Sequence, residues 1–238
     1  FFFKQKTAYE IRNCDWSSNV CSSDLAVAGL QYLLTRKGPV ASSLFETGGF
    51  WYADPDARSP DIQFHLGLGT GIEHGVVAMP QGGVTLNSCY LRPRSRGTVR
   101  LQSSDPAHAP LIDPNYLEDS RDRELSIAGL KLTQEILSQD ALKPFIKAER
   151  LPGGEVKTDQ DYFDFICQHS KTSHHCAGTC RMGPDAEAVV DIRLKFKGIS
   201  DLRIVDNSIM PTAISSNTNA AAIMIGEKAV DMIREDHA

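Results

Sequence analysis

The residues best suited to chemistry lie close together, in residues 167–182, which read CQHSKTSHHCAGTCRM. Histidine and cysteine are the usual ligands of zinc, but His174, His175 and Cys176 are adjacent and cannot easily all reach one metal ion, and the stretch has no Cys-x-x-Cys pair. A catalytic thiolate at Cys180, with a histidine as its activating base, is a second possibility. The third is a histidine that works as a general base near neutral pH.

The residues around His175 favour the third possibility. Residues 172–183 read TSHHCAGTCRMG. This stretch resembles the signature of the glucose-methanol-choline (GMC) family of flavin oxidoreductases, in which a histidine and two variable residues precede Gly-Thr-Cys-Arg-Met-Gly. His175 stands at the position of the family's catalytic histidine, and Cys176 replaces the proline that usually follows it. The neighbouring His174 is the other candidate for the base.

The resemblance covers nearly everything from about Gly29 onward. Residues 198–206 (GISDLRIVD) are similar to the family's approach to its last strand, and residues 217–228 to its closing helix. Upstream, residues 91–97 and 110–114 are also similar to family segments. Each segment alone is weak, and it is their order and spacing together that make the resemblance specific.

The resemblance implies an active site that uses FAD and oxidises a primary alcohol. His175 would accept the hydroxyl proton while hydride passes to flavin N5, and Asn217 would hydrogen-bond the alcohol oxygen. The implied cofactor contacts come from Asp206, Asn207, Thr218 and Asn219. A strand end before Asp206 and a helix N-terminus at Asn219 are places where α/β folds hold ligands. Without the resemblance, the simpler interpretation is that Asp206 and Asn207 make a turn and Asn217 caps the helix.

Periodicity predicts the elements that position these residues. Alternation of apolar and polar residues predicts a strand at residues 61–66. Turn signals around them predict strands at residues 84–92 and 98–101, and a short apolar strand at residues 202–205. Helical spacing of apolar residues predicts helices at residues 26–37, 120–142, 159–169 and 219–235. Thr158 and Asp161 resemble a capping box at the start of the third helix. The predicted fold class is α+β: an antiparallel-sheet substrate-binding lobe with helices, plus the C-terminal strand and helix of an incomplete FAD-binding α/β domain.

The motifs and elements divide the chain into three segments. Residues 1–25 look like translated sequencing adapter, because residues 4–10 and 15–25 are what the nucleotide sequence of such an adapter encodes. We expect this segment to be disordered. Residues 26–170 are expected to be part of the substrate-binding lobe, and residues 171–238 the C-terminal catalytic and FAD-domain segment. No Gly-x-Gly-x-x-Gly fingerprint follows a strand. We therefore expect the chain to be the C-terminal part of a longer flavoenzyme, inactive alone.

Composition excludes several other classes of protein. The 238 residues carry a net charge of -5, which is unlike the basic face of a nucleic-acid-binding protein. No apolar run approaches the ~18 residues of a membrane span. The cysteines after residue 25 are clustered rather than spread as in a disulfide framework, so a reducing compartment and a cytoplasmic location are expected. The sequence names neither the alcohol, nor the electron acceptor, nor the oligomeric state.

Two alternatives to the flavoenzyme interpretation stay open at this point. One is a metal-binding domain built on the His/Cys cluster, although the spacing leads us to expect no metal ligands. The other is a non-catalytic binding domain that is complete in itself. A glycine fingerprint in the upstream reading frame would distinguish the enzyme from both.

Overall fold

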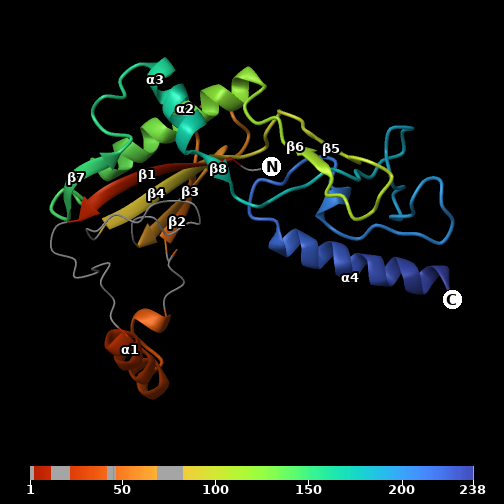
Figure 1. The fold of residues 1–238 in the computed structure, drawn as a ribbon, viewed down its shortest axis with the longest axis horizontal. Coiled ribbons are helices and arrows are strands. Elements are labelled where there is room, and N and C mark those ends of the chain that lie inside the picture. The colour runs from red at the N-terminus through yellow and green to blue at the C-terminus, as the bar shows by residue number, and fades with distance from the viewer. Residues whose placement is uncertain (1–2, 12–21, 42–44, 46, 69–82, 238) are drawn as a thin grey trace. The chain divides into compact units, whose positions relative to one another are not determined.

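The structure is a computed structural model that describes residues 3–11, 22–41, 45, 47–68 and 83–237 (Figure 1). It contains helices and antiparallel strands, which confirms the expected α+β class. The chain divides into two compact units, and each is described here by itself. The sheet unit comprises Lys4–Cys89 and Leu125–Lys171, and the histidine unit is formed mainly by Tyr90–Glu124 and Thr172–Ala238.

The sheet unit is built on a sheet whose strands lie in the order β2-β3-β4-β1-β7. These strands are β1 (Phe3–Ile11), β2 (Thr47–Trp51), β3 (Ile62–Leu68), β4 (Gly83–Tyr90) and β7 (Ile146–Leu151). β1 pairs antiparallel with both β4 and β7, and β2 pairs antiparallel with β3. β4 is buried along its whole length, so it runs through the core. The short strand β8 (Lys171–Thr172) follows the last helix of this unit.

Strand β1 lies within residues 1–25, the segment that the sequence led us to expect as disordered. Residues 3–11 form this strand, and helix α1 (Ser22–Thr35) begins within the same segment, whereas residues 1–2 and 12–21 lie outside the described part of the chain. A β-ladder is made by backbone N–H and C=O groups, which every non-proline residue carries. A segment with no clear side-chain period can therefore occupy a position between two strand edges.

Two helices cover one face of the sheet, α2 (Ser120–Leu137) and α3 (Asp159–His169) (Figure 1). Within α2, a Cβ added at Gly129 would lie 3.1 Å from Ser88 Oγ and 3.3 Å from Ile62 Cδ1. The helix therefore packs so closely against side chains of β3 and β4 that a Cβ at this position would require them to shift. α3 begins with the predicted capping box, because Thr158 and the Asp161 side chain each bind the other's backbone.

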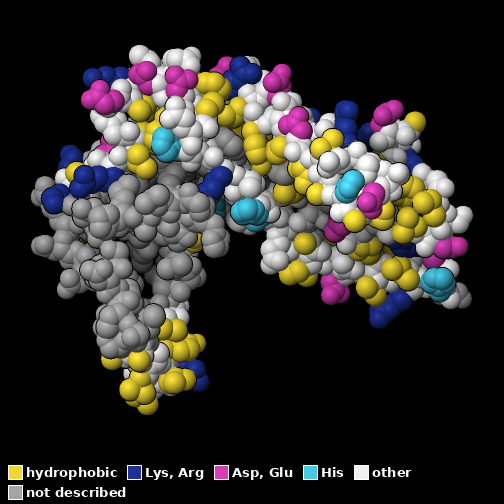
Figure 2. All heavy atoms as spheres, in the orientation of Figure 1, with side chains coloured by type: hydrophobic (Ala, Val, Ile, Leu, Met, Phe, Trp, Pro, Cys, Tyr) yellow, Lys and Arg dark blue, Asp and Glu magenta, His cyan; other side chains and the backbone are white. Residues whose placement is uncertain are grey.

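Helix α1 confirms the helix predicted at residues 26–37, although it begins earlier. A one-turn helix, η1 (Pro39–Ala41), follows it. The apolar side chains of α1 gather on an exposed surface (Figure 2). They are Val27, Leu30, Leu33 and Leu34, each more than half exposed. Among the described residues, no helix has both the length and the apolar character needed to cross a membrane.

The histidine unit contains a two-stranded antiparallel sheet, a one-turn helix and a long C-terminal helix. These elements are β5 (Thr98–Arg100), β6 (Leu111–Asp113), η2 (Asn207–Ile209) and α4 (Asn219–Asp236). α4 contributes Ile225 and Ala229 to a buried apolar cluster. The remaining members of this cluster are Val190, Leu194, Ile209 and Met210. This cluster fixes α4 against the segments that carry the site.

Two sequence predictions about this unit differ from the structure. Residues 202–205 are not a strand: the only ladder contact described there is a single bridge between Lys195 and Arg203. A strand needs neighbours that continue the ladder, and the described chain supplies none on either side. In addition, residues 90–124 fall within the expected substrate-binding lobe, yet they cluster with the C-terminal segment, where Arg92 donates a hydrogen bond to Ser215 (2.7 Å).

Candidate active site

The structure brings together the two residues on which the predicted chemistry depends. His175 and Asn217 are 42 residues apart in the chain, yet the Asn217 amide nitrogen lies 2.6 Å from His175 Nε2. On the other side of the ring, Nδ1 lies 3.0 Å from the hydroxyl oxygen of Thr218. The imidazole is therefore held at both nitrogens by two consecutive residues.

Burial differs between the two edges of this imidazole. Thr218 is only 4% exposed, His175 is half-buried, and Asn217 is exposed. The Nδ1 edge thus faces the interior of the unit, and the Nε2 edge faces an amide that solvent reaches. This is the side on which a small molecule could meet the ring.

The start of α4 explains how Asn217 and Thr218 come to face the histidine. Thr218 is the N-cap residue of α4, but its side chain makes no capping hydrogen bond. The N-cap position thus belongs to Thr218, whereas the simpler interpretation gives it to Asn217. Both side chains just before the helix are instead directed to His175, and the helix itself is anchored through its buried residues further along.

Backbone hydrogen bonds hold the loop after His175 against η2. The N–H of Cys180 donates to the Ser208 carbonyl (2.9 Å), and the N–H of Met182 donates to the Ile209 carbonyl (2.8 Å). Gly178 lies between them and the histidine with φ of +91°, in the left-handed region that favours glycine. The Gly-Thr-Cys-Arg-Met-Gly motif therefore acts here as a backbone clamp.

Asp206 and Asn207 lie in the segment that this clamp holds. The Asp206 carboxylate accepts a hydrogen bond from the Ser208 N–H (2.7 Å) and so caps η2, as the turn interpretation requires. The side-chain oxygen of Asn207 is buried and has no hydrogen-bond partner within the described chain. Buried polar atoms normally have partners, so this oxygen is a position that a bound ligand could satisfy.

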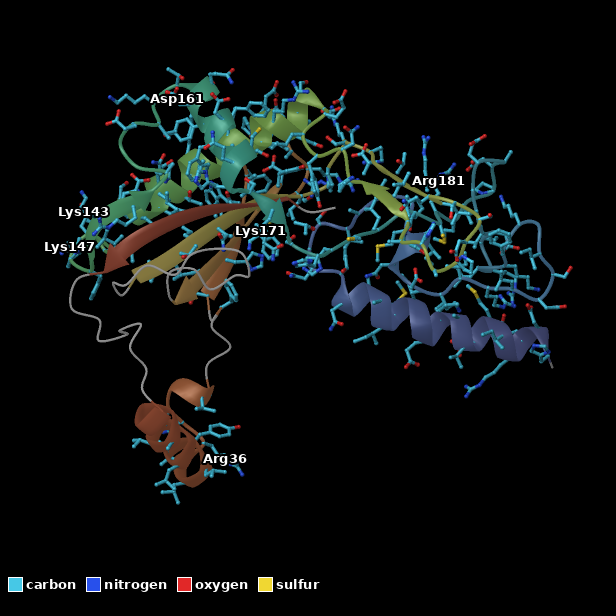
Figure 3. All side chains as sticks on the ribbon, in the orientation of Figure 1. Arg36, Lys143, Lys147, Asp161, Lys171 and Arg181 are labelled. Atoms are coloured by element: carbon cyan, nitrogen blue, oxygen red, sulfur yellow. The ribbon has the colours of Figure 1, made fainter. Side chains whose placement is uncertain are left out.

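Arg181, in the middle of the motif, is already paired. Its guanidinium donates two hydrogen bonds to Asp185, at 2.6 and 2.9 Å. Arg181 is labelled in Figure 3. These hydrogen bonds hold the pKa of the Asp185 carboxyl well below its usual value. Arg181 also lines a polar cavity of about 280 Å³ within the histidine unit. The other lining residues belong to segments 93–99, 177–179 and 211–213.

The remaining histidine and cysteine residues form no second site in the described chain. His174 is exposed, and its backbone N–H donates to Thr172 Oγ1 (3.1 Å). Cys167 and Cys176 are exposed, Cys180 is half-buried, and all three are thiols rather than disulfides. Within the described ranges, no three His, Cys, Asp or Glu side chains are grouped so that they could hold a metal ion.

One neighbour of the site could not be predicted from the sequence. Tyr116 is half-buried, and its side chain hydrogen-bonds Thr172, which precedes His175 by three residues. Burial raises the pKa of Tyr116 above its ordinary value, and the hydrogen bond to Thr172 lowers it by less. The only signal is its place just after the family-like residues 110–114.

Comparisons with known proteins match the segment that carries this candidate site. A family model described as GMC oxidoreductase matches residues 93–226, more than half of the chain and including His175 and Asn217. An alcohol dehydrogenase [acceptor] of Pseudomonas putida is 41% identical over 203 residues, 85% of this chain and 37% of its own length. The mitochondrial choline dehydrogenase of Homo sapiens is 39% identical over 208 residues, 87% of this chain and 35% of its own length.

Solved structures show the same fold. Pyridoxine 4-oxidase from Mesorbium loti matches with a TM-score of 0.79 and 27% identity, over all of this chain and 42% of that one. A formate oxidase matches with a TM-score of 0.88 and 22% identity, over 99% of this chain and 46% of that one, and shows the fold alone. The chain spans between 35% and 38% of the length of the curated relatives it matches. From the family match over residues 93–226, this chain belongs to the GMC oxidoreductase family.

Proposed function

We propose that this chain is the C-terminal part of an FAD-dependent alcohol dehydrogenase that oxidises a primary alcohol. The observation that carries the proposal is the 2.6 Å contact between the Asn217 amide and His175 Nε2, inside the segment that matches the family. The names of the relatives, alcohol dehydrogenase and choline dehydrogenase, support an alcohol as substrate. Their greater length supports a missing partner segment, without which the chain is inactive.

The two side chains divide the work on the substrate hydroxyl. His175 Nε2 accepts the hydroxyl proton as a general base, a role that typically contributes about 10²- to 10⁴-fold to the rate. The Asn217 amide N–H donates to the alcohol oxygen and stabilises the negative charge that develops there. Because Asn217 is exposed, a hydroxyl that arrives from solvent can reach its amide, and it binds both groups by displacing the 2.6 Å contact between them.

The residues at the start of α4 and η2 fit FAD as the cofactor. Asn207 offers a buried side-chain oxygen that lacks a partner within the described chain, which suits an N–H group of a ligand. The N-terminus of the 18-residue helix α4, at Asn219, favours negative charge through its dipole. Asp206 is exposed and adjoins Asn207, and Asp206 and Thr218 complete the set of four residues that would hold the cofactor. When bound, FAD supplies the acceptor for the hydride of the alcohol carbon.

The test uses the complete enzyme, expressed from the full upstream reading frame and loaded with FAD. We expect His175→Ala to lower the rate of flavin reduction by a primary alcohol at least about 10²-fold. The measurement is anaerobic stopped-flow absorbance of the flavin. His174→Ala is the matched control, because this adjacent exposed side chain should change the rate by less than about threefold. An unchanged rate in His175→Ala would remove His175 from the role of base.

A further inference from the structure

The sheet unit contains an apolar cavity of about 370 Å³. One wall comes from strands β2, β3 and β4, and the opposite wall comes from the end of α2 and the segment that leads to β7. The cavity therefore lies on the face of the sheet that α2 covers (Figure 1). Among the described residues that line it, Thr47 has the only polar side chain, and none is charged.

Gly49 leaves this cavity open on the side of the sheet. It pairs with Phe64 in the ladder between β2 and β3, so the two positions face the same side of the sheet. The Phe64 side chain is buried and lines the cavity, whereas Gly49 places no side chain opposite it. A Cβ built at Gly49 would meet no atom within 4 Å. Glycine inside a strand often marks a place where a ligand approaches closely.

We propose that this cavity is a binding site for a neutral apolar small molecule about twice the size of benzene. An apolar cavity of about 150 Å³ stays dry and binds benzene. The cavity in the sheet unit is more than twice as large, and a single threonine side chain does not supply the several polar partners that a bound water needs. A charged molecule would lose its hydration without gaining an ion pair from the described walls.

Phe145 borders the cavity where it meets solvent. It lines the cavity although 59% of its surface is exposed, whereas Phe64 on the opposite wall is only 5% exposed. A ligand can therefore reach the site beside Phe145 without separating α2 from the sheet. The two rings also favour an aromatic ligand, because aromatic pairs attract each other beyond the area that they bury. The site lies within the sheet unit and does not depend on the proposed role of His175.

The first experiment titrates the 238-residue chain with 1-fluoronaphthalene, a neutral two-ring molecule, and follows its fluorine NMR signal. We expect a Kd below about 1 mM, and no displacement of the probe by an about tenfold higher concentration of the anion 1-naphthoate. Gly49→Leu should fill the cavity and weaken binding at least about tenfold. Gly29→Leu is the matched control. A Cβ there also meets nothing within 4 Å but lies in α1, outside the cavity lining, so the Kd should change by less than about threefold.

A second variant decides the matter if Gly49→Leu does not fold. Phe145→Ala removes an exposed ring, so circular dichroism should show an unchanged fold while the Kd rises at least about threefold. The complete FAD-loaded enzyme should bind the probe with a Kd within about threefold of that of the chain. Three results overturn the inference. They are unchanged binding in folded Gly49→Leu or in Phe145→Ala, displacement of the probe by naphthoate, and loss of binding in the complete enzyme, where an upstream segment would then fill the cavity.

Discussion

Asp236 is the residue on which the C-terminal end of α4 depends. Its carboxylate accepts hydrogen bonds from Arg193 and Lys195, at 2.8 and 2.6 Å, and from Arg203. The hydrogen bond from Lys195 is the largest cause that lowers the pKa of Asp236, from 3.8 to about 2. The three cationic side chains come from residues 193–203, so this one carboxylate connects the C-terminal end of α4 to that segment of the chain.

The depressed pKa of Asp236 predicts how the stability of the chain depends on pH. A carboxyl whose pKa is lower in the folded state stabilises that state above its ordinary value of about 4, and this contribution is lost as pH falls toward 2. We expect Asp236→Asn to be less stable than the unmodified chain at pH 6, and the difference to shrink below pH 4 and to disappear only below pH 2. Urea denaturation at each pH measures it. A difference that stays constant across this range would contradict the prediction.

Single residues also show how far the sequence could predict the site. His175 and Asn217 could be identified because a spaced motif and a closing-helix segment resemble the family on each side of them. The hydrogen-bond partner of Thr218 could not be identified, because the sequence alone does not tell whether this side chain contacts the cofactor or a histidine. In the structure its hydroxyl lies 3.0 Å from His175 Nδ1. Two further features depend on tertiary packing, which no local sequence pattern encodes. They are the buried Asn207 side-chain oxygen, which has no partner within the described chain, and the hydrogen bond between Tyr116 and Thr172.

Among the elements, those with strong local signals could be predicted and those that depend on partners could not. The capping box of α3 and the apolar alternation of β3 and β4 are local, and the structure confirms them with shifted ends. β2, β6 and β7 escape prediction, because their side chains are mostly exposed or half-buried and lack apolar alternation. Residues 202–205 have the apolar residues typical of a strand, but within the described chain they form only a single bridge and not a ladder with neighbouring strands.

Two helical glycines predict opposite effects of a larger side chain. In α2, Gly129 lies against Ser88 and Ile62, so Gly129→Val should overpack this contact and destabilise the chain by about 1–3 kcal/mol. In α4, a Cβ at Gly226 would meet nothing within 4 Å. Gly226→Ala should therefore stabilise by about 0.5–1 kcal/mol, through helix propensity alone. Thermal unfolding of both variants measures this, and equal effects at the two positions would contradict the packing of α2.

At the scale of the whole molecule, the two units are assembled from segments that alternate along the chain. Residues 90–124 cluster with residues 172–238, although residues 125–171, which lie between them in the sequence, belong to the sheet unit. A linear division at residue 170 could not show this, because contacts between distant segments leave no compositional boundary. α4 also exposes large apolar side chains, as α1 does, and such surfaces are typical of faces that another part of a protein covers. The exposed large apolar residues of α4 are Ile223, Met224, Val230 and Ile233.

These exposed faces, and the share of its relatives that the chain spans, lead to a prediction about the cofactor. We expect the purified 238-residue chain to retain less than about a tenth of an equivalent of FAD and to oxidise no alcohol, because most contacts with the cofactor would come from the missing segment. Absorbance of the flavin after gel filtration measures the retained amount. A chain that stays stoichiometrically yellow would show that it holds the cofactor without help.

The position of β1 has a practical consequence for anyone who trims this chain. Residues 3–11 look like translated adapter by their sequence, so a truncation that removes them is an obvious choice for an experimenter. Yet they pair with β4 on one side and β7 on the other, so their deletion strips hydrogen-bond partners from two strands at once. Bare strands of this kind invite self-association. Residues 3–11 thus cover, in this fold, the edges of β4 and β7 that their removal would leave open.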